Sequence, residues 1–166
     1  MGAIPFKTHN VVGEKIWRMI LINNFLLVSD ALAYIYRGDA TPLGITITRA
    51  SNFFLFALEY ILLIMFVHYV KHITSTDENE PTTWWEYLSF VLHAVAFAGL
   101  IITQFTGLYY FFDDTNHYQR GNGIWISFTA CGTVILICFF RLWLHRKNLS
   151  KSEKSTFSLC IVIFFV

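Results

Sequence analysis

The sequence predicts an all-α protein, a polytopic bundle of transmembrane helices that forms a single module over residues 1–166. Charged residues make up 14% of the chain, against about 25% in an average soluble domain, and 55% of the residues are apolar. The charges are clustered, so that the stretches 87–112 and 121–140 contain none. Each stretch can cross about 30 Å of hydrocarbon as a helix. Runs such as 60–67 are apolar at every position, which excludes the alternating pattern of a barrel strand.

The first predicted span covers residues 16–36. It resembles a secretion signal, because Lys7, Lys15 and Arg18 precede or open an apolar run. Asn23 and Asp30 interrupt that run, which then continues to residue 36, so we expect a retained helix.

The remaining spans are predicted at 50–70, 84–109 and 123–144. Polar connections at 75–81 and 113–122 separate them. A fifth apolar segment, 157–166, has about half the length of a span and is therefore expected to be an incomplete helix. The chain is accordingly interpreted as a fragment of a longer protein.

Lysine and arginine are unevenly divided between the two predicted sides of the membrane, and cytoplasmic loops carry the excess. Nine lie on the side of the N-terminus: Lys7, Lys15, Arg18, Lys71, Arg141, Arg146, Lys147, Lys151 and Lys154. Three lie on the other side: Arg37, Arg49 and Arg120. We therefore predict a multi-pass protein of the cell membrane with a cytoplasmic N-terminus and an extracellular 113–122 loop. The near-zero net charge gives no basis for nucleic-acid binding.

Polar residues inside the predicted spans are functional candidates, because ionisable groups are costly in lipid. These are Asp30, Asn52, Glu59 and His93. Glu59 and His93 lie at depths that differ by roughly one helical turn on adjacent spans, which makes a hydrogen bond between them plausible. Asn52 precedes Glu59 by seven residues and extends the same helix face. The four residues either fix the packing of the bundle or form a ligand or proton site.

Three further patterns have ordinary structural readings. His68 and His72 share a helix face and, with His93, could ligate haem, but an interfacial position explains them better, so no metal or cofactor is predicted. Cys131, Cys138 and Cys160 lie in apolar segments as small hydrophobic residues. Small residues at four-residue spacing predict a seam for close helix packing: Gly99, Thr103 and Gly107.

The predicted outer loop is the most distinctive segment. Its candidate sensing residues are Tyr109, Tyr110, Asp113, Asp114, Asn116, Tyr118 and Arg120. Asp and Asn build turns, Gly121 permits a positive φ, and Arg120 can pair with Asp113 or Asp114. The loop is equally compatible with a structural turn and with a recognition patch.

Residues 103–121 resemble the Q-F-T-G-L-Y-Y-x-F-D-x-x-N-x-Y-x-R-G pattern of the membrane sensor region in clostridial-type, Gram-positive signalling proteins. Weaker similarity extends to 30–33, 49–53 and 146–150. In those proteins the membrane module precedes a histidine kinase or a GGDEF diguanylate cyclase domain. This chain has no phosphoacceptor His box, ATP-binding glycine motif or GGDEF motif, so the resemblance implies an input module without enzymatic activity of its own.

The leading functional hypothesis is therefore a sensory module of a signal-transduction protein. It would contact the lipid bilayer, self-associate through its helices and respond to an extracellular or membrane signal. A fragment of a transporter or channel is the alternative, in which Asp30, Glu59 and His93 would line a pathway. A haem-bearing redox subunit is a third and weaker one. The three prolines, Pro5, Pro42 and Pro81, lie outside the predicted spans, which counts against transporters built on broken helices.

Overall fold

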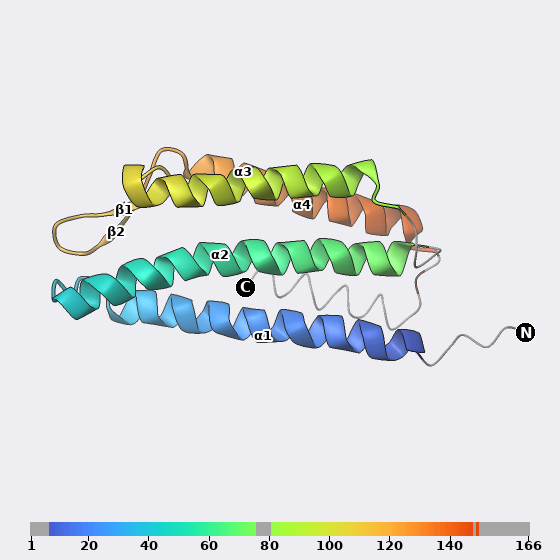
Figure 1. Cartoon of the computed structure of the whole chain (residues 1–166), viewed down its shortest axis with the longest axis horizontal. Coiled ribbons are helices and arrows are strands. Elements are labelled where there is room, and N and C mark those ends of the chain that lie inside the picture. The colour runs from blue at the N-terminus through green and yellow to red at the C-terminus, as the bar shows by residue number, and fades with distance from the viewer. Residues whose placement is uncertain (1–6, 76–80, 148, 150–166) are drawn as a thin grey trace, which may run out of the picture.

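The computed structural model describes residues 7–75, 81–147 and 149, and it contains four long helices and one short β-hairpin (Figure 1). The elements are α1 (Lys7–Ile35), α2 (Pro42–Thr74), α3 (Trp84–Thr106), β1 (Tyr110–Phe112), β2 (Tyr118–Arg120) and α4 (Ile124–His145). All four helices are long and apolar enough to cross a membrane. The predicted helical bundle is confirmed, but the strands make "all-α" incomplete. The predicted fifth segment, 157–166, lies outside the described residues.

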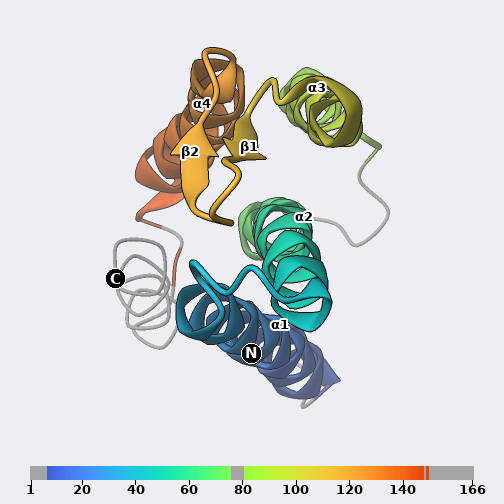
Figure 2. The ribbon, with the colours of Figure 1, turned by 90° about the vertical axis from the view of Figure 1, so that its left-hand side faces the viewer.

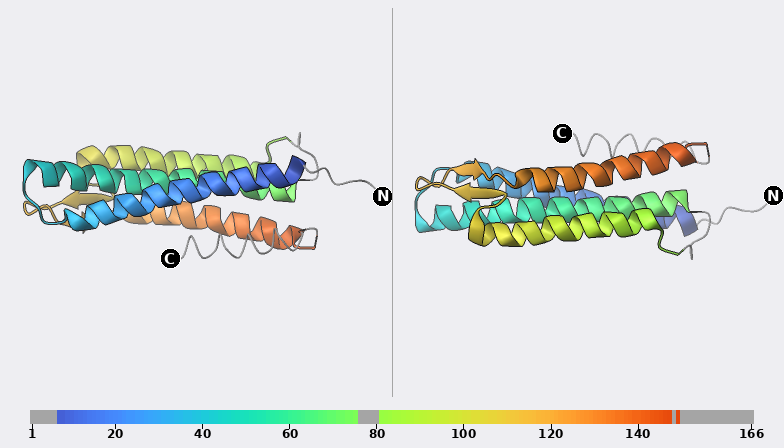
Figure 3. Two further views of the ribbon diagram at one scale, coloured as in Figure 1. Left: turned by 90° about the horizontal axis from the view of Figure 1, so that it is seen from below. Right: turned by 90° about the horizontal axis from the view of Figure 1, so that it is seen from above.

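The helices alternate in direction, so the connections gather at the two ends of the bundle (Figures 1 and 3). One end, called here the hairpin end, contains residues 36–41 and 107–123. The other, called the opposite end, contains the start of α1, the end of α2, the start of α3 and the end of α4. The two groups of loops that the charge pattern separates thus lie at different ends.

The second helix begins eight residues before its predicted start at residue 50. Thr41 is its N-cap and accepts a hydrogen bond from Gly44 N at 3.1 Å, while Pro42 occupies the first turn, where its missing N–H costs nothing. The predicted start was wrong because the long apolar run, from which it was taken, begins only after Arg49. The local Thr-Pro signal is the better guide to where the helix starts.

The third and fourth helices follow the prediction more closely. The third begins at Trp84 as expected, and the Glu86 carboxylate Oε2 accepts hydrogen bonds from Thr83 N and Oγ1, both at 2.8 Å. It ends at Thr106, three residues early, because Gly107 adopts a left-handed conformation with φ 69° and caps the helix. The fourth helix matches its predicted bounds within one residue.

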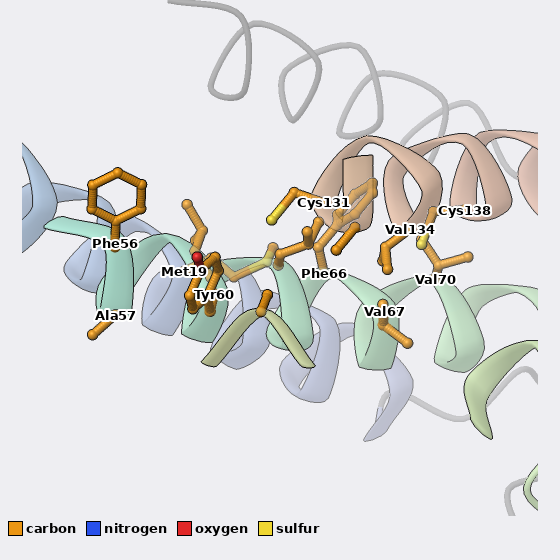
Figure 4. Close-up of a cluster of buried hydrophobic side chains, with 14 of the residues drawn as sticks. Met19, Phe56, Ala57, Tyr60, Phe66, Val67, Val70, Cys131, Val134 and Cys138 are labelled. Carbon is orange, nitrogen blue, oxygen red and sulfur yellow. The ribbon is translucent and has the colours of Figure 1, made fainter. Parts of the chain in front are cut away.

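The second helix is the centre of the bundle. It contacts α1, α3 and α4, whereas α1 packs mainly against α2 (Figure 2). Half of the membrane-length window of α2 is buried, compared with 6% of that of α1. The core runs along α2 and includes Phe66, Val134 and both described cysteines, Cys131 and Cys138, which confirms that these two are buried packing residues (Figure 4). The third, Cys160, lies outside the described residues.

Two polar contacts fix the neighbours of α2. Near the middle of the bundle, the hydroxyls of Tyr60 and Ser127 lie 2.7 Å apart and join α2 to α4. At the opposite end, Lys71 Nζ lies 2.9 Å from Glu86 Oε1 and joins α2 to α3. The first contact is buried, and in the second a buried Glu86 meets a partly exposed Lys71, so that the buried polar groups have partners. They hold the three inner helices in register.

Candidate functional site

The predicted outer loop is a β-hairpin that Asp113 closes. Its strands pair Tyr110 with Arg120 and Phe112 with Tyr118. Asp113 Oδ1 accepts hydrogen bonds from Thr115 N, Thr115 Oγ1 and His117 N at 2.8–3.0 Å. These donors hold the pKa of Asp113 well below its usual range, with the His117 amide making the largest contribution. Asp113 is therefore a carboxylate that folds the turn.

Two predictions about this loop were wrong. No ion pair joins Arg120 to Asp113 or Asp114 within the part of the chain that the structure describes; Gln119 Nε2 instead donates to Asp113 Oδ2 at 3.1 Å. Gly121 also lacks a positive φ. A Cβ there would collide with the carbonyl oxygens of residues 107 and 108, so glycine is needed for close backbone approach.

Asn116 fastens the tip of the hairpin to the loop between α1 and α2. It is 3% exposed and adopts φ 59°, a left-handed conformation that Asn tolerates better than most residues. Its Nδ2 donates to Asp39 O at 2.8 Å and to Thr48 Oγ1 at 3.2 Å, and its backbone carbonyl accepts from Gly38 N at 3.1 Å. We call this set of contacts the Asn116 latch. It joins segments about 70–80 residues apart in sequence.

The latch depends on two neighbouring features. Gly38 has φ 81°, and a Cβ there would lie 3.0 Å from the His117 ring, so only glycine fits without strain. Thr48, 1% exposed, donates its own hydroxyl proton to Tyr36 O at 3.0 Å. The α1–α2 loop, the start of α2 and the hairpin therefore form one hydrogen-bonded unit.

Aromatic side chains pack the hairpin onto the helices. The Tyr110 ring stacks on Phe56 of α2 at 5.4 Å and on Tyr118 at 5.6 Å between centroids. Its hydroxyl accepts a hydrogen bond from Gln104 Nε2 at 3.0 Å. Burial raises the pKa of both Tyr110 and Tyr118. Both phenols are thus neutral and available as hydrogen-bonding groups.

Tyr109 occupies the predicted packing seam. It is fully buried, and its hydroxyl donates to Ala96 O at 3.1 Å. A Cβ on Gly99 would collide with the Tyr109 phenol. Thr103 accepts a hydrogen bond from Tyr109 N at 3.1 Å. Gly99 and Thr103 therefore receive a tyrosine of the same chain, and Gly107 caps the helix, so the expectation that these residues admit another helix is wrong for this arrangement.

A pocket of about 290 Å³ lies beside this hairpin, between α1, α2 and β2. We call it the hairpin-end pocket. Its polar lining comes from Asp30 and Arg37 around α1, Thr48 and Asn52 on α2, and Tyr118 on β2. Phe56 adds an aromatic wall. Three of the predicted site residues, Asp30, Asn52 and Tyr118, are thus brought together.

The chemistry of this pocket combines both charge signs with hydrogen-bonding groups. Asp30 and Arg37 are exposed, and the described residues provide no ion pair between them. Asn52 is 8% exposed and donates Nδ2 to Thr48 O at 2.8 Å. Its carbonyl oxygen remains available as an acceptor. The arrangement suits a small molecule with an amino group and an acidic group.

The other predicted intramembrane residues form no common site. Glu59 and His93 share no hydrogen bond or ion pair in the described ranges; His93 Nδ1 instead lies 2.7 Å from the Ser89 carbonyl of its own helix turn. The expected pairing is therefore not made. Within the same ranges no three His, Cys, Asp or Glu side chains group as a metal site, so His68, His72 and His93 do not converge.

Of the loop candidates, Asp113 and Asn116 shape the hairpin, Tyr109 and Tyr110 pack it, and Asp114 and Arg120 are exposed outside the pocket. Sequence reasoning missed Arg37 and Thr48. Arg37 was treated only as a loop charge, and the Thr48 hydroxyl shows its role only when the hairpin is in place.

No family model, curated protein or solved structure matches the chain.

Proposed function

We propose that this chain is a membrane-embedded input module of a signal-transduction protein, with its hairpin end outside the cell. One observation carries the proposal: the hairpin-end pocket gathers Asp30, Arg37, Asn52 and Tyr118 beneath the Asn116 latch. The four helices of membrane-crossing length and the excess of Lys and Arg at the opposite end support this orientation. The resemblance of residues 103–121 to clostridial-type sensor regions supports it independently.

The pocket suits a sensor because its walls belong to elements that are held with different strength. The walls from α2 and β2 belong to the core and the latched hairpin, whereas α1 is mostly exposed and packs mainly on α2. A ligand that bridges Asp30 on α1 and Tyr118 on β2 would favour one position of α1 over another. The direction of α1 is thus the signal that we expect to be transmitted to a cytoplasmic output domain.

Ligand binding is tested on the full chain in lipid nanodiscs with a panel of free amino acids and other small zwitterions. We expect at least one to raise the melting temperature of the wild type. Asp30→Asn and Asn52→Leu should abolish the shift, because the first removes the negative charge of the pocket and the second removes its amide. Asp114→Asn, an exposed change outside the pocket, should keep it. Equal shifts in all four proteins would contradict the proposed pocket.

Transport is distinguished from sensing by uptake of the same compound into proteoliposomes. Binding without uptake supports the input module, whereas saturable accumulation of the compound inside the vesicles would show that the protein is a transporter instead. The sensor proposal also expects a kinase or diguanylate cyclase domain encoded in the same gene or beside it, which sequencing of the surrounding DNA checks.

A further inference from the structure

A second pocket, at the opposite end of the bundle, has a different chemistry. It is a groove of about 390 Å³ between α3 and α4, which lie side by side (Figure 3). We call it the α3–α4 groove. Its lining is apolar apart from Arg141 and Thr133 and includes Trp85, Leu136, Ile137, Phe140 and Leu144. No group of the proposed sensing pocket contributes to it.

Two hydrogen-bond donors in this groove lack acceptors. Trp85 is 3% exposed, and its indole Nε1 has no partner among the described residues. Arg141 Nε is buried and likewise unpaired in that part of the chain. The Arg141 guanidinium lies 5.6 Å from the centroid of the Trp85 ring, so both donors belong to one cluster. The two nitrogens are themselves shielded, but the Arg141 guanidinium is a cation that lines the groove, and a cation next to hydrocarbon needs an anion.

Within the described part of the chain, no acidic side chain at this end is left to pair with Arg141. The nearby acid Glu86 is already engaged by Lys71 Nζ at 2.9 Å and by Thr83 N and Oγ1. The other charged groups of α4 at this end, Arg146 and Lys147, are positive. Charge complementarity therefore favours a negatively charged occupant.

The depth of the cluster favours a lipid over a soluble anion. Arg141 lies four residues before the end of α4, about 6 Å along the axis, which is headgroup level for a spanning helix. Ile137 and Thr133 continue the groove about 6 and 12 Å further toward the middle of the bundle. An acyl chain can follow this path while its phosphate remains at Arg141.

We propose that the α3–α4 groove binds an anionic phospholipid. Its phosphate pairs with the Arg141 guanidinium, and one acyl chain lies against Leu136, Ile137 and Phe140. The inference rests on the membrane location of the chain but not on its signalling role, and it assigns this groove to the leaflet at the opposite end of the bundle.

Native mass spectrometry of the full chain in detergent micelles tests the site. The probes are phosphatidylglycerol, phosphatidylcholine with the same acyl chains, and inorganic phosphate. We expect one phosphatidylglycerol to bind about tenfold more tightly than phosphatidylcholine, because only the former leaves a net negative charge for Arg141. Inorganic phosphate should not bind, since it lacks the acyl chain. Equal binding of both lipids, or tight binding of free phosphate, would overturn the proposal.

Variants separate the phosphate contact from general packing. Arg141→Gln should remove the preference for phosphatidylglycerol, because it removes the positive charge that faces the groove. Leu136→Trp fills the groove without changing the charge and should weaken the binding of both lipids. The control Arg146→Gln alters a cation at the same end that stacks on Trp143, 4.6 Å from that ring, and should bind as the wild type does. The lipid site would be refuted by an unchanged lipid preference in Arg141→Gln. It would also be refuted if the wild type formed a dimer instead of binding lipid and Leu136→Trp abolished that dimer.

Discussion

Asn116 is the residue of the predicted loop that connects the hairpin to the α1–α2 loop and the start of α2. Its side chain reaches Asp39 and Thr48, and its backbone adopts a left-handed conformation. The sequence indicated a turn-forming residue correctly, since Asn and Asp favour turns. It could not indicate the partners, because they lie on a different connection of the bundle and adopt their positions only on folding.

Replacing Asn116 by alanine should destabilise the protein by about 2–3 kcal/mol, because its side-chain hydrogen bonds to Tyr36 O, Asp39 O and Thr48 Oγ1 are lost and the buried Thr48 hydroxyl loses a donor. Asn116→Gly tolerates φ 59° and so isolates the hydrogen bonds from the backbone penalty. We expect Asn116→Gly to be destabilised, but less than Asn116→Ala. Unfolding in detergent measures both, and wild-type stability of either variant would contradict the latch.

Gly99 provides a second test at the level of one residue. Gly99→Ala should cost about 2 kcal/mol, since the new methyl group must displace the Tyr109 phenol from Ala96. In a Tyr109→Leu background the same change should cost less, because the hydroxyl that it displaces is gone. A double-mutant cycle of unfolding free energies gives the coupling. Additive costs would show that Gly99 and Tyr109 do not interact.

The carboxylate of Asp113 makes the hairpin sensitive to acid. Its pKa is lower in the folded protein than the usual value of about 3.9, so its stabilising contribution is complete above that value and is lost as the pH falls through the folded pKa. We expect the protection factors of residues 110–120, which correct amide exchange for its intrinsic pH dependence, to fall below about pH 4. Asp113→Asn should exchange faster at neutral pH and lose this dependence. Identical pH profiles for both proteins would exclude Asp113 as the cause.

At the level of elements, the sequence located the helices better than their ends. The third and fourth helices were predicted within a few residues because apolar length agrees with Glu86 in the first turn of α3 and with Gly123 at the N-cap of α4. The hairpin was missed. Tyr109 to Phe112 continue the apolar run of α3, and aromatic residues suit both a membrane interface and a strand. Only the left-handed Gly107 marks the change, and its conformation is not visible in the sequence.

The early start of α2 is testable through its cap. Thr41→Ala removes the acceptor of the Gly44 N–H and should destabilise the first turn by about 1 kcal/mol. Faster amide exchange at residues 44–47 would report this. Thr46→Ala, whose exposed hydroxyl only bonds back to Pro42 O, is the matched control. If exchange at 44–47 is already unprotected in the wild type, α2 begins later than described.

For the whole molecule, hydropathy predicted the number and order of the described helices but not which faces meet. Glu59 and His93 illustrate the gap: similar depth on consecutive helices suggested a pair, yet His93 bonds to its own helix. Depth follows from counting residues, whereas rotation about the helix axis depends on packing. The meeting of Asp30 and Tyr118 in one pocket could not be predicted either, because it depends on the hairpin, which was not predicted and which folds back over α2.

The proposed orientation of the whole chain is tested by labelling. Asp114→Cys places a thiol on the exposed hairpin turn, and we expect membrane-impermeant maleimide to label it in intact cells. The parent chain, whose described cysteines are buried, is the control. Labelling only after the cells are permeabilised would reverse the orientation and remove the basis for an extracellular pocket.

The Asn116 latch also has a mechanical consequence. It ties the turn that follows α1 to the hairpin, so that this end of α1 acts as a fixed pivot. The rest of α1 packs mainly against α2. The helix has 29 residues and is about 44 Å long. A rotation of about 3° at the pivot would therefore displace the far end by roughly 2 Å. A small rotation at the latch would therefore be amplified along α1 into a displacement large enough to change side-chain packing at the opposite end of the bundle.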